Sequence, residues 1–459
     1  MREFFKSFFS FGAATAIERF LSFILVPICT RIFTTVEYGV IDLCQVFVGV
    51  LSIFTLFQLE TALQRYYFEW NELEKKKLLS TLFMFISLIS ALVVIVFLIL
   101  APFVSAKLFD GKDYSSLIRI SLVQLPFLNI SMLGLLILRY EKRNILFLLQ
   151  ISLKSVLLLF FVLLFVVFFK KGIEWIFYSQ LIVLILSSLI LLVNIKDLLV
   201  PIFSRSILKI CLKYSLPQFP ARIGSALLTY SNRFFMIGFL STSAIGIYSV
   251  SLKFASMIQL IGSAFVLAWS PFMYAQFTKN NHKETFVRVL PLVSSLLFLC
   301  VALLSLFSEE IVRFTSGDKF YDAHYYLGGL SLYFALYIVK EVVDIGPKYT
   351  EKTKYLSYNF LCTLIVNILS MYFFIDLWGL KGVVFSMVLT YLFLLVISWF
   401  VSNRLYYIPF KKLQFLVLLL PTFLLSFWMM YHSIGICLRI MLACLYLLYY
   451  LIIALQIKK

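Results

Sequence analysis

The sequence is poor in charged residues and lacks the motifs of soluble enzymes. Only 14% of its 459 residues are charged, against about 25% in soluble globular domains. Its seven cysteines form no CxxC pair and its three histidines lie far apart, so neither a disulfide framework nor a metal site is indicated. It contains no P-loop and no nucleophile–base constellation. We therefore expect a protein that is not an enzyme, needs no cofactor and does not use ATP directly.

Long apolar runs fill the chain instead, and 62% of the residues are hydrophobic. Each run is about 20 residues long, which is what a helix needs to cross a bilayer. The runs predict fourteen transmembrane helices at 8–32, 40–63, 79–103, 116–138, 145–169, 173–195, 214–239, 244–272, 287–307, 324–345, 356–375, 381–402, 413–431 and 434–456. The predicted fold is therefore an all-α polytopic membrane protein. The first run continues past Glu18 and Arg19 without a cleavage site, so we expect an uncleaved first span.

Basic residues gather in alternate loops. An even number of spans puts both termini on one side, and 24 of the 40 Lys and Arg residues fall in the termini and loops of that side, against 8 in the opposite loops. Because loops rich in Lys and Arg stay in the cytoplasm, both termini are predicted to be cytoplasmic. The same surplus accounts for the net charge of +18 without nucleic-acid binding.

The chain also contains an internal repeat at an offset of 207 residues. TTVEYGVIDL (34–43) aligns with STSAIGIYSV (241–250), and GIEWIFYSQL (172–181) aligns with GLKGVVFSMV (379–388). Each repeat is predicted to form one lobe of the protein. Because each lobe holds an even number of spans, the two lobes are predicted to be parallel repeats, with the same orientation in the membrane. We predict an N-terminal six-helix lobe at 1–195, a basic cytoplasmic linker at 196–213, a C-terminal six-helix lobe at 214–402 around a shared central cavity, and two additional transmembrane helices at 413–456.

Eight cations lie within or at the ends of the spans: Arg19, Arg119, Lys154, Arg222, Arg233, Lys253, Lys340 and Arg439. A charge at mid-bilayer is costly unless it faces water or a partner. Arg222 and Arg233 belong to one helix face with Gln218, Ser225 and Thr229, because these residues follow one another at helical spacing. Lys253 lies on a similar face of the next span. These faces predict a polar cavity, the alternative being a structural polar seam between helices.

The remaining membrane charges leave two interpretations open. Arg119 and Arg439, near span ends, are expected to snorkel to the surface, while Lys154 fits a cavity or snorkelling equally well. Acidic residues are fewer, which favours an anionic ligand, and Glu18, Glu60 and Asp344 are candidates for coupling transport to a proton or sodium ion. Asp344 also stands four residues after Lys340, a spacing that suits a structural ion pair.

Four stretches resemble a known family: RFLSFILVPICTRIFTTVEYGVIDL (19–43), ALQRYYFEW (62–70), YEKRN (140–144), and YSLPQFP with NRFFMIGFLSTSAIGIYSVSLKF (within 214–254). They are similar to polysaccharide or O-antigen flippases (Wzx type) of the multidrug/oligosaccharidyl-lipid/polysaccharide exporter superfamily. The resemblance covers the twelve-span core. Where that family often has Asp-Arg in its seventh span, this chain has Asn232 and Arg233.

The resemblance implies translocation of an undecaprenyl-diphosphate-linked sugar repeat unit from the cytoplasmic to the periplasmic leaflet of the bacterial inner membrane by alternating access. By position, Arg19, Arg222, Arg233 and Lys253 would hold the diphosphate, with Arg65 at the cytoplasmic mouth. The expected partners are this lipid-linked oligosaccharide, the bilayer, a coupling proton or sodium ion, and other polysaccharide assembly proteins.

Two alternative functions fit part of the pattern. A multidrug exporter of the same fold would favour an acidic cavity for cationic drugs, whereas cations dominate here. A polysaccharide polymerase handles the same lipid-linked sugars, but such enzymes usually carry a large periplasmic loop, and the outer loops here are short.

Overall fold

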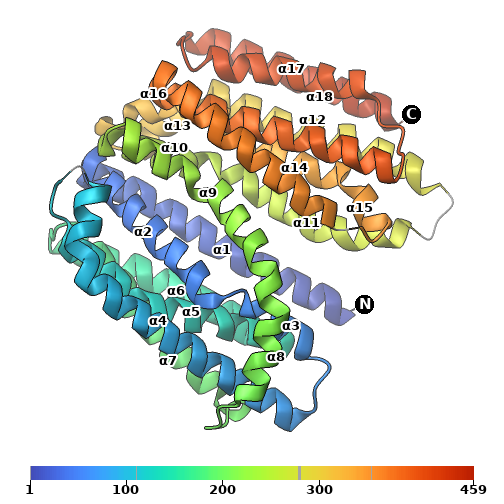
Figure 1. Ribbon diagram of the computed structural model, residues 1–459. Helices are drawn as coiled ribbons and strands as arrows, with labels where there is room; N and C mark the ends of the chain where they lie inside the picture. The colour runs from blue at the N-terminus through green and yellow to red at the C-terminus, as the bar shows by residue number, and fades with distance from the viewer. Residues whose placement is uncertain (1, 110, 278–280, 353, 459) are drawn as a thin grey trace. The chain divides into compact units, whose positions relative to one another are not determined.

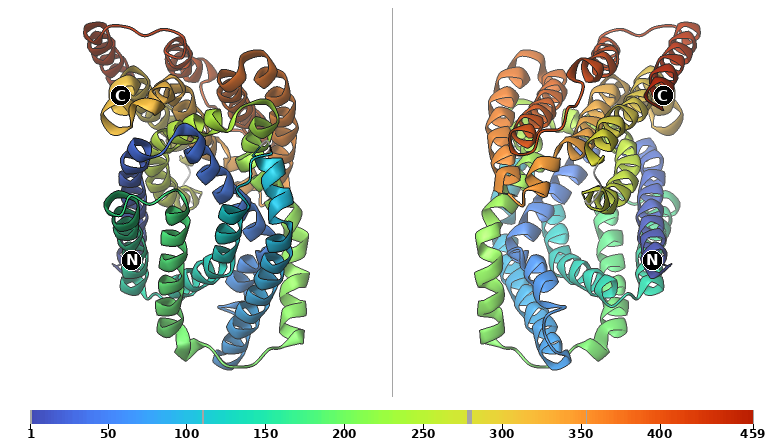
Figure 2. Two further views of the ribbon diagram at one scale, coloured as in Figure 1. Left: turned by 90° about the vertical axis from the view of Figure 1, so that its left-hand side faces the viewer. Right: turned by 90° about the vertical axis from the view of Figure 1, so that its right-hand side faces the viewer.

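The computed structural model describes residues 2–109, 111–277, 281–352 and 354–458, with only the backbone described for residues 2–11, 13–15, 221, 267, 270–271, 454 and 456–458. Lys279 and Lys459, which the loop-charge prediction counts, lie outside these residues. Across the described ranges the chain forms helices and loops and no strand (Figures 1 and 2). The predicted all-α class is confirmed.

The helices of the first half of the chain are α1 (Arg2–Ile32), α2 (Thr35–Leu56), α3 (Leu59–Tyr66), α4 (Glu72–Leu108), α5 (Ser115–Tyr140), α6 (Asn144–Val162), η1 (Leu163–Phe168), α7 (Glu174–Ile195), η2 (Lys196–Leu198), α8 (Arg205–Ser215) and η3 (Leu216–Gln218). Those of the second half are α9 (Phe219–Phe239), α10 (Thr242–Ala255), α11 (Met257–Gln276), α12 (His282–Leu306), α13 (Ser308–Thr315), η4 (Asp318–Ala323), α14 (His324–Val343), α15 (Ile345–Tyr349), α16 (Lys354–Leu405), α17 (Lys412–Trp428) and α18 (Ile436–Lys458).

Nine helices of the described chain are long and apolar enough to cross a membrane, or ten if the bent pair α10 and α11 forms one span. A polytopic membrane fold is thus confirmed, and the number fourteen stays a prediction. Part of the difference comes from α16, whose 52 residues contain two predicted spans joined at Gly379. The backbone of Gly379 has φ 55°, a conformation that glycine adopts readily, and it produces the kink between the two spans.

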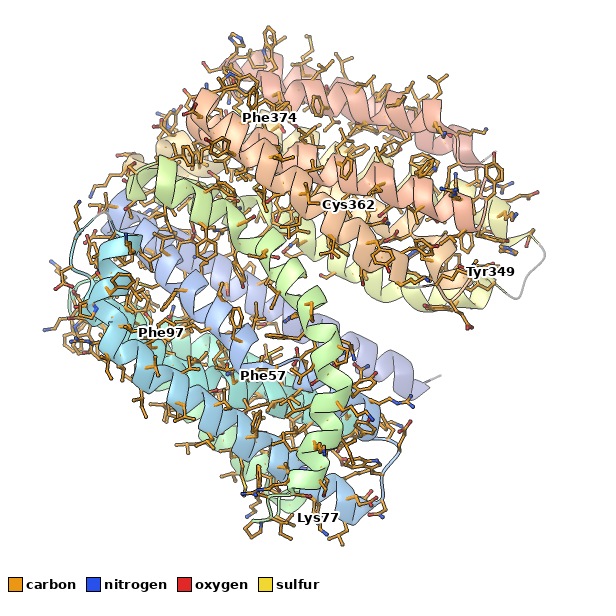
Figure 3. The ribbon with its side chains drawn as sticks, in the orientation of Figure 1. Phe57, Lys77, Phe97, Tyr349, Cys362 and Phe374 are labelled. Carbon is orange, nitrogen blue, oxygen red and sulfur yellow. The ribbon has the colours of Figure 1, made fainter. Side chains whose placement is uncertain are left out.

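Two further predicted spans are each built from two helices. The span at 40–63 breaks where Phe57 and Gln58 adopt left-handed φ angles of 47° and 59°. The ring of Phe57 (labelled in Figure 3) lies at this break, with its centre 5.7 Å from the ring centre of Phe219. The span at 244–272 bends by 43° between α10 and α11. There the hydroxyl of Ser256 donates to the carbonyl oxygen of Lys253 at 2.7 Å and competes with the helical backbone bonds.

The chain divides into two compact units. The first comprises Met1–Ile28 and Gly39–Tyr230, and the second comprises Cys29–Tyr38 and Ser231–Lys459. The hairpin tip between α1 and α2 therefore belongs with the second half of the chain, and α9 contributes to both units. Because these units follow contacts and not the repeat, the predicted lobes at 1–195 and 214–402 stay a prediction.

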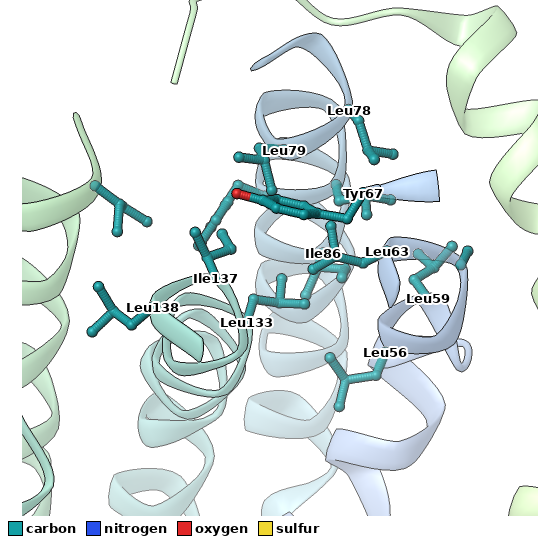
Figure 4. Packing of buried hydrophobic residues seen from close by; sticks show 14 of the residues in the cluster. Leu56, Leu59, Leu63, Tyr67, Leu78, Leu79, Ile86, Leu133, Ile137 and Leu138 are labelled. Carbon is teal, nitrogen blue, oxygen red and sulfur yellow. The ribbon is translucent and has the colours of Figure 1, made fainter. Parts of the chain in front are cut away.

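In the first unit α4 packs on α5, and α7 packs on α5 and α6. Leucine and isoleucine side chains make up most of its buried cluster, and Figure 4 labels members from α2, α3, α4 and α5. Tyr67 lies in this cluster and donates a hydrogen bond to the carboxylate of Glu141. A buried polar seam crosses the same unit, because Asn129 on α5 bonds to Ser52, Thr55 and Ser90 on α2 and α4.

In the second unit α14 is the central helix, and it contacts α10, α11, α12, α16 and α17. The helices α17 and α18 both pack on α12, so the predicted additional helices join this unit. The expected snorkelling of Arg439 on α18 is wrong. The residue is only 4% exposed, and its guanidinium pairs with Glu309 and Glu310 on α13. Arg119, by contrast, is exposed.

Candidate substrate-binding site

The helix α9 presents the predicted polar face. Pro217 and Pro220 stand at its start, where a missing backbone N–H costs nothing. Arg222 is half-buried and makes no hydrogen bond or ion pair with the described residues. About two turns further on, Thr229 is exposed and donates to the carbonyl oxygen of Ser225 at 2.9 Å. The face thus carries two small hydroxyl residues and a guanidinium that is unpaired among the described residues, although its charge acts on Glu60.

Arg233 ends this face and is buried, with 7% of its surface exposed. Its Nη1 donates to Oδ1 of Asn232 at 3.1 Å, and its guanidinium carbon lies 4.9 Å from the ring centre of Tyr248 on α10. The amide of Asn232 also donates to the hydroxyl of Tyr248, which in turn lies 2.9 Å from the sulfur of Met387 on α16. Neutral groups therefore orient this arginine, and sequence reasoning found neither Tyr248 nor Met387.

Lys253 is exposed on α10, where it belongs to the second of the two predicted polar faces. Its Nζ donates to the hydroxyl of Tyr38 at 2.9 Å and lies 4.9 Å from the centre of that ring. Tyr38 belongs to the α1–α2 hairpin tip, which is also joined to α10 by a 2.7 Å bond between the hydroxyls of Thr35 and Ser243. The hairpin tip thus positions this cation.

The first unit contains a cavity of about 250 Å³. Its polar lining comes from Gln45, Ser121, Gln124, Lys154 and Gln180, with apolar walls that include Phe177 and Leu184. Lys154 therefore lines a cavity, the first of its two predicted interpretations. The three glutamines were not predicted, although each interrupts an apolar run and could have been found by that signal.

Glu18 lies beside this cavity lysine, with its carboxylate 3.5 Å from Nζ of Lys154. The neighbouring Arg19 is half-buried on α1. Both residues belong to the first unit. The pair shows that Glu18 already has a cationic partner, so its charge is balanced without an added ion.

The short helix α3 holds two more predicted residues. Arg65 is exposed, and its Nη2 lies 3.0 Å from a carboxylate oxygen of Glu69. Glu60 is partly buried, and its Oε2 is enclosed without a hydrogen-bond partner among the described residues. An enclosed carboxylate oxygen without a donor is costly when charged, which makes Glu60 a candidate for binding a proton.

Asp344 lies in a different environment, at the break between α14 and α15. It is fully buried, and its Oδ2 lies 2.6 Å from Nζ of Lys340. The same Nζ donates to Glu341 at 3.1 Å, and Lys348 donates to the other oxygen of Glu341 at 3.0 Å. The i, i+4 pair is therefore present within a four-residue charge network.

The five predicted cations are distributed over both units. Arg19, Arg65 and Arg222 lie in the first unit, and Arg233 and Lys253 lie in the second. Among the described residues, no group of three or more His, Cys, Asp or Glu side chains is placed to hold a metal ion. The geometry thus offers cations with polar neighbours in both units.

Comparison with known proteins places these features in a family. The family model for "Polysaccharide biosynthesis protein" matches residues 28–324, which include α9 and α10 with Arg222, Arg233 and Lys253. The chain belongs to this family. No protein with a curated description matches the chain.

Solved structures show that this polysaccharide biosynthesis protein shares a transporter fold. The lipid II flippase MurJ in an inward closed conformation superposes with a TM-score of 0.73 at 17% identity, covering 97% of this chain and 99% of MurJ. An inward-facing multidrug resistance MATE family transporter of the MOP superfamily gives 0.62 at 14% identity over 85% and 93%. A MOP superfamily transporter from Pyrococcus furiosus gives 0.53 at 14% identity over 88% and 95%. The resemblance predicted from the sequence motifs is confirmed for family and fold.

Proposed function

We propose that the protein is a flippase that moves undecaprenyl-diphosphate-linked polysaccharide repeat units from the cytoplasmic to the periplasmic leaflet of the bacterial inner membrane. Membership of the polysaccharide biosynthesis family and a fold shared with the lipid II flippase MurJ support a lipid-linked sugar as the substrate. The observation that carries the proposal is Arg222, a half-buried guanidinium without a hydrogen bond or ion pair among the described residues. Such a group is suited to an anionic ligand.

In this proposal the diphosphate is held by charge-assisted hydrogen bonds from Arg19, Arg222, Arg233 and Lys253. Arginine suits this role because its fork of N–H donors matches two phosphate oxygens at once. Arg65, which is exposed on α3, acts at the entrance. The prenyl chain stays in the lipid while the two lobes, 1–195 and 214–402, alternate between inward and outward access.

The cavity of the first unit suits the sugar part of the substrate. Its glutamines offer both donors and acceptors, which sugar hydroxyls require. Its apolar wall includes Phe177, and an aromatic ring packs well against the apolar face of a sugar. Its volume of about 250 Å³ limits the occupant to a small part of a repeat unit.

Among the three acidic candidates, Glu60 is the one we propose for ion coupling. Glu18 and Asp344 already lie 3.5 and 2.6 Å from lysine ammonium groups. The Oε2 of Glu60 is enclosed without a hydrogen-bond donor among the described residues, and Arg222, whose charge acts on Glu60, forms no ion pair with it, so protonation relieves an unfavourable charge. Replacement by Gln is therefore expected to leave folding intact and to remove the dependence of transport on a proton gradient.

The experiment is complementation of a cell that lacks its polysaccharide flippase, with lipid-linked repeat units measured on both leaflets. The variant R222A/R233A/K253A is expected to accumulate repeat units on the cytoplasmic side and to export none. R222K/R233K, which keeps the charges, should retain partial export, and R404A, which removes an exposed arginine, should export normally.

Two results would contradict the proposal. Normal export by the triple alanine variant, with its membrane level unchanged, would remove the diphosphate role of these cations. Drug resistance conferred by the wild type, with no movement of lipid-linked sugar, would assign the protein to the multidrug exporters that share its fold.

A further inference from the structure

The helix α8 carries a basic face opposite the face by which it packs. Arg205, Lys209 and Lys213 recur every four residues and so project from one side of the helix. All three are exposed, and none makes a hydrogen bond or ion pair with the described residues. On the opposite side Ile207 and Cys211 are 9% and 0% exposed, and they pack into the core of the first unit.

Backbone contacts fix this helix against α4. The N–H groups of Val200 and Ser204 donate to the hydroxyls of Ser80 and Thr81 at 2.8 and 3.1 Å. Figure 1 shows α8 crossing the start of α4, and Figure 3 labels Lys77 at that end of the unit. The basic face is thus held on a rigid support and is not part of a loose linker.

More cations lie around α8 than nearby acidic residues neutralise. Lys75 pairs with Glu72 at 2.8 Å, and Arg143 pairs with Asp197 at 2.6 Å. Three others make no ion pair within the described chain, namely Lys76, Lys77 and Lys196. A local surplus of positive charge therefore remains, on the side that the loop cations predict to be cytoplasmic.

Exposed apolar side chains flank the same face. They are Ile202, Phe203, Ile210, Tyr214 and Leu216, each between 37% and 45% exposed. Exposure of five apolar side chains to water within fifteen residues is unfavourable. The boundary between lipid headgroups and acyl chains accommodates them, because apolar side chains there meet hydrocarbon while neighbouring cations meet phosphate.

We propose that α8 is a binding site for the headgroups of anionic phospholipids in the leaflet on this side. Arg205, Lys209 and Lys213 bind the phosphates, and Ile210 and Tyr214 enter the acyl boundary beside them. Cations clustered next to membrane spans bind anionic lipid through this charge attraction. The inference does not depend on the proposed transport activity, because it concerns a surface outside the predicted substrate site.

The test uses the full-length protein in detergent, titrated with phosphatidylglycerol and followed by native mass spectrometry. The variant R205Q/K209Q/K213Q is expected to bind this lipid roughly 100-fold more weakly. Each of the three cations is expected to contribute a similar factor to the affinity for an anionic headgroup. The matched control R404Q/K411Q/K412Q removes three exposed cations from the same predicted side and should bind almost as well as the wild type. R205K/K209R/K213R keeps the charges and should bind normally.

Equal weakening in both glutamine variants would overturn the proposal, because net charge and not this face would then decide binding. Unchanged phosphatidylglycerol binding by R205Q/K209Q/K213Q would overturn the proposal as well. The same conclusion would hold if this variant kept its lipid binding but no longer bound an acidic protein that the wild type binds. If the triple variant unfolds, K209Q replaces it, with about 5-fold weaker binding expected.

Discussion

Arg439 on α18 donates two hydrogen bonds from Nη1 to the carboxylate of Glu310 on α13, at 2.8 and 2.9 Å, across 129 residues of sequence. The same guanidinium pairs with Glu309, and its Nε donates to the carbonyl oxygen of Ile434 at 2.6 Å. One buried cation thus joins the last helix of the chain to the core of the second unit.

Replacing Arg439 by Ala should destabilise the protein by roughly 2–3 kcal/mol, because two carboxylates lose their shared partner in a mostly buried site. Thermal unfolding in detergent measures the loss. R404A is the control, since Arg404 is exposed and should unfold at the wild-type temperature. Equal unfolding temperatures for R439A and the wild type would show that α18 is held by apolar packing alone.

The same cluster should make the protein sensitive to acid. Hydrogen bonds from Tyr321 and Arg439 hold the pKa of Glu309 below its ordinary value. A lowered pKa contributes stability that is present above the ordinary value, about 4.3 for Glu, and that is lost as the pH falls through the pKa of the folded state. E309Q should have a lower unfolding temperature than the wild type at pH 7. Between pH 5 and 3 its unfolding temperature should fall by less than that of the wild type. Parallel curves for the two proteins would contradict this assignment.

Asn129 should be the most sensitive polar residue of the first unit. It is fully buried and exchanges hydrogen bonds of 2.6, 2.7 and 2.9 Å with Ser52, Thr55 and Ser90. N129L leaves three hydroxyls on two other helices without this partner, for a loss of about 2 kcal/mol. N359L is the control, because the side chain of Asn359 makes a single hydrogen bond within the described chain, of 3.4 Å to Ser398, and a larger loss in N359L would contradict the prediction.

Replacing Asp344 by Asn should lower the stability of the fold more than it lowers transport activity. The change removes the partner 2.6 Å from Lys340 and leaves a buried ammonium with Glu341, for a cost of about 3 kcal/mol. The double variant K340M/D344L removes both charges and should recover much of the loss, since a buried pair is often no more stable than apolar residues. Thermal unfolding of the three proteins decides the matter, and a double variant weaker than D344N would refute it.

Gly346 permits the close approach of α15 to α16. A Cβ atom there would lie 2.2 Å from the carbonyl oxygen of Ser402, and the backbone N–H of Gly346 donates to the hydroxyl of the same residue at 2.7 Å. G346A should therefore cost several kcal/mol, roughly as overpacking does. At Gly238 on α9 a Cβ would meet nothing within 4 Å, so G238A should be neutral or stabilising by about 0.5–1 kcal/mol.

Hydrophobicity and spacing predicted the features that depend on nearby residues. The apolar runs located the helices, and the four-residue spacing of Lys340 and Asp344 anticipated their ion pair. The pairs Arg439–Glu310 and Lys154–Glu18 join residues more than 100 positions apart, and no local pattern carries that information. The snorkelling expected of Arg439 was wrong for this reason, because a distant acidic helix offered it a buried partner.

The residues around Arg233 show the same limit at the candidate site. Spacing placed the arginine on the polar face of α9, but it did not indicate that Asn232 and Tyr248 would orient it. Asn232 adjoins Arg233 in the sequence and so could have been considered. Tyr248 contacts it only because the bend after α9 returns α10 beside it.

The hairpin tip Cys29–Tyr38 has a consequence for the order of biosynthesis. Thr30, Thr35 and Tyr38 make their hydrogen bonds with Gly317, Ser243 and Lys253, which follow them by 287, 208 and 215 residues. During translation the tip therefore leaves the ribosome long before any of these partners exists. The first unit can form once Tyr230 has been synthesised, whereas Gly317, the last of these three partners, follows only later, and the early tip must remain accessible throughout that interval.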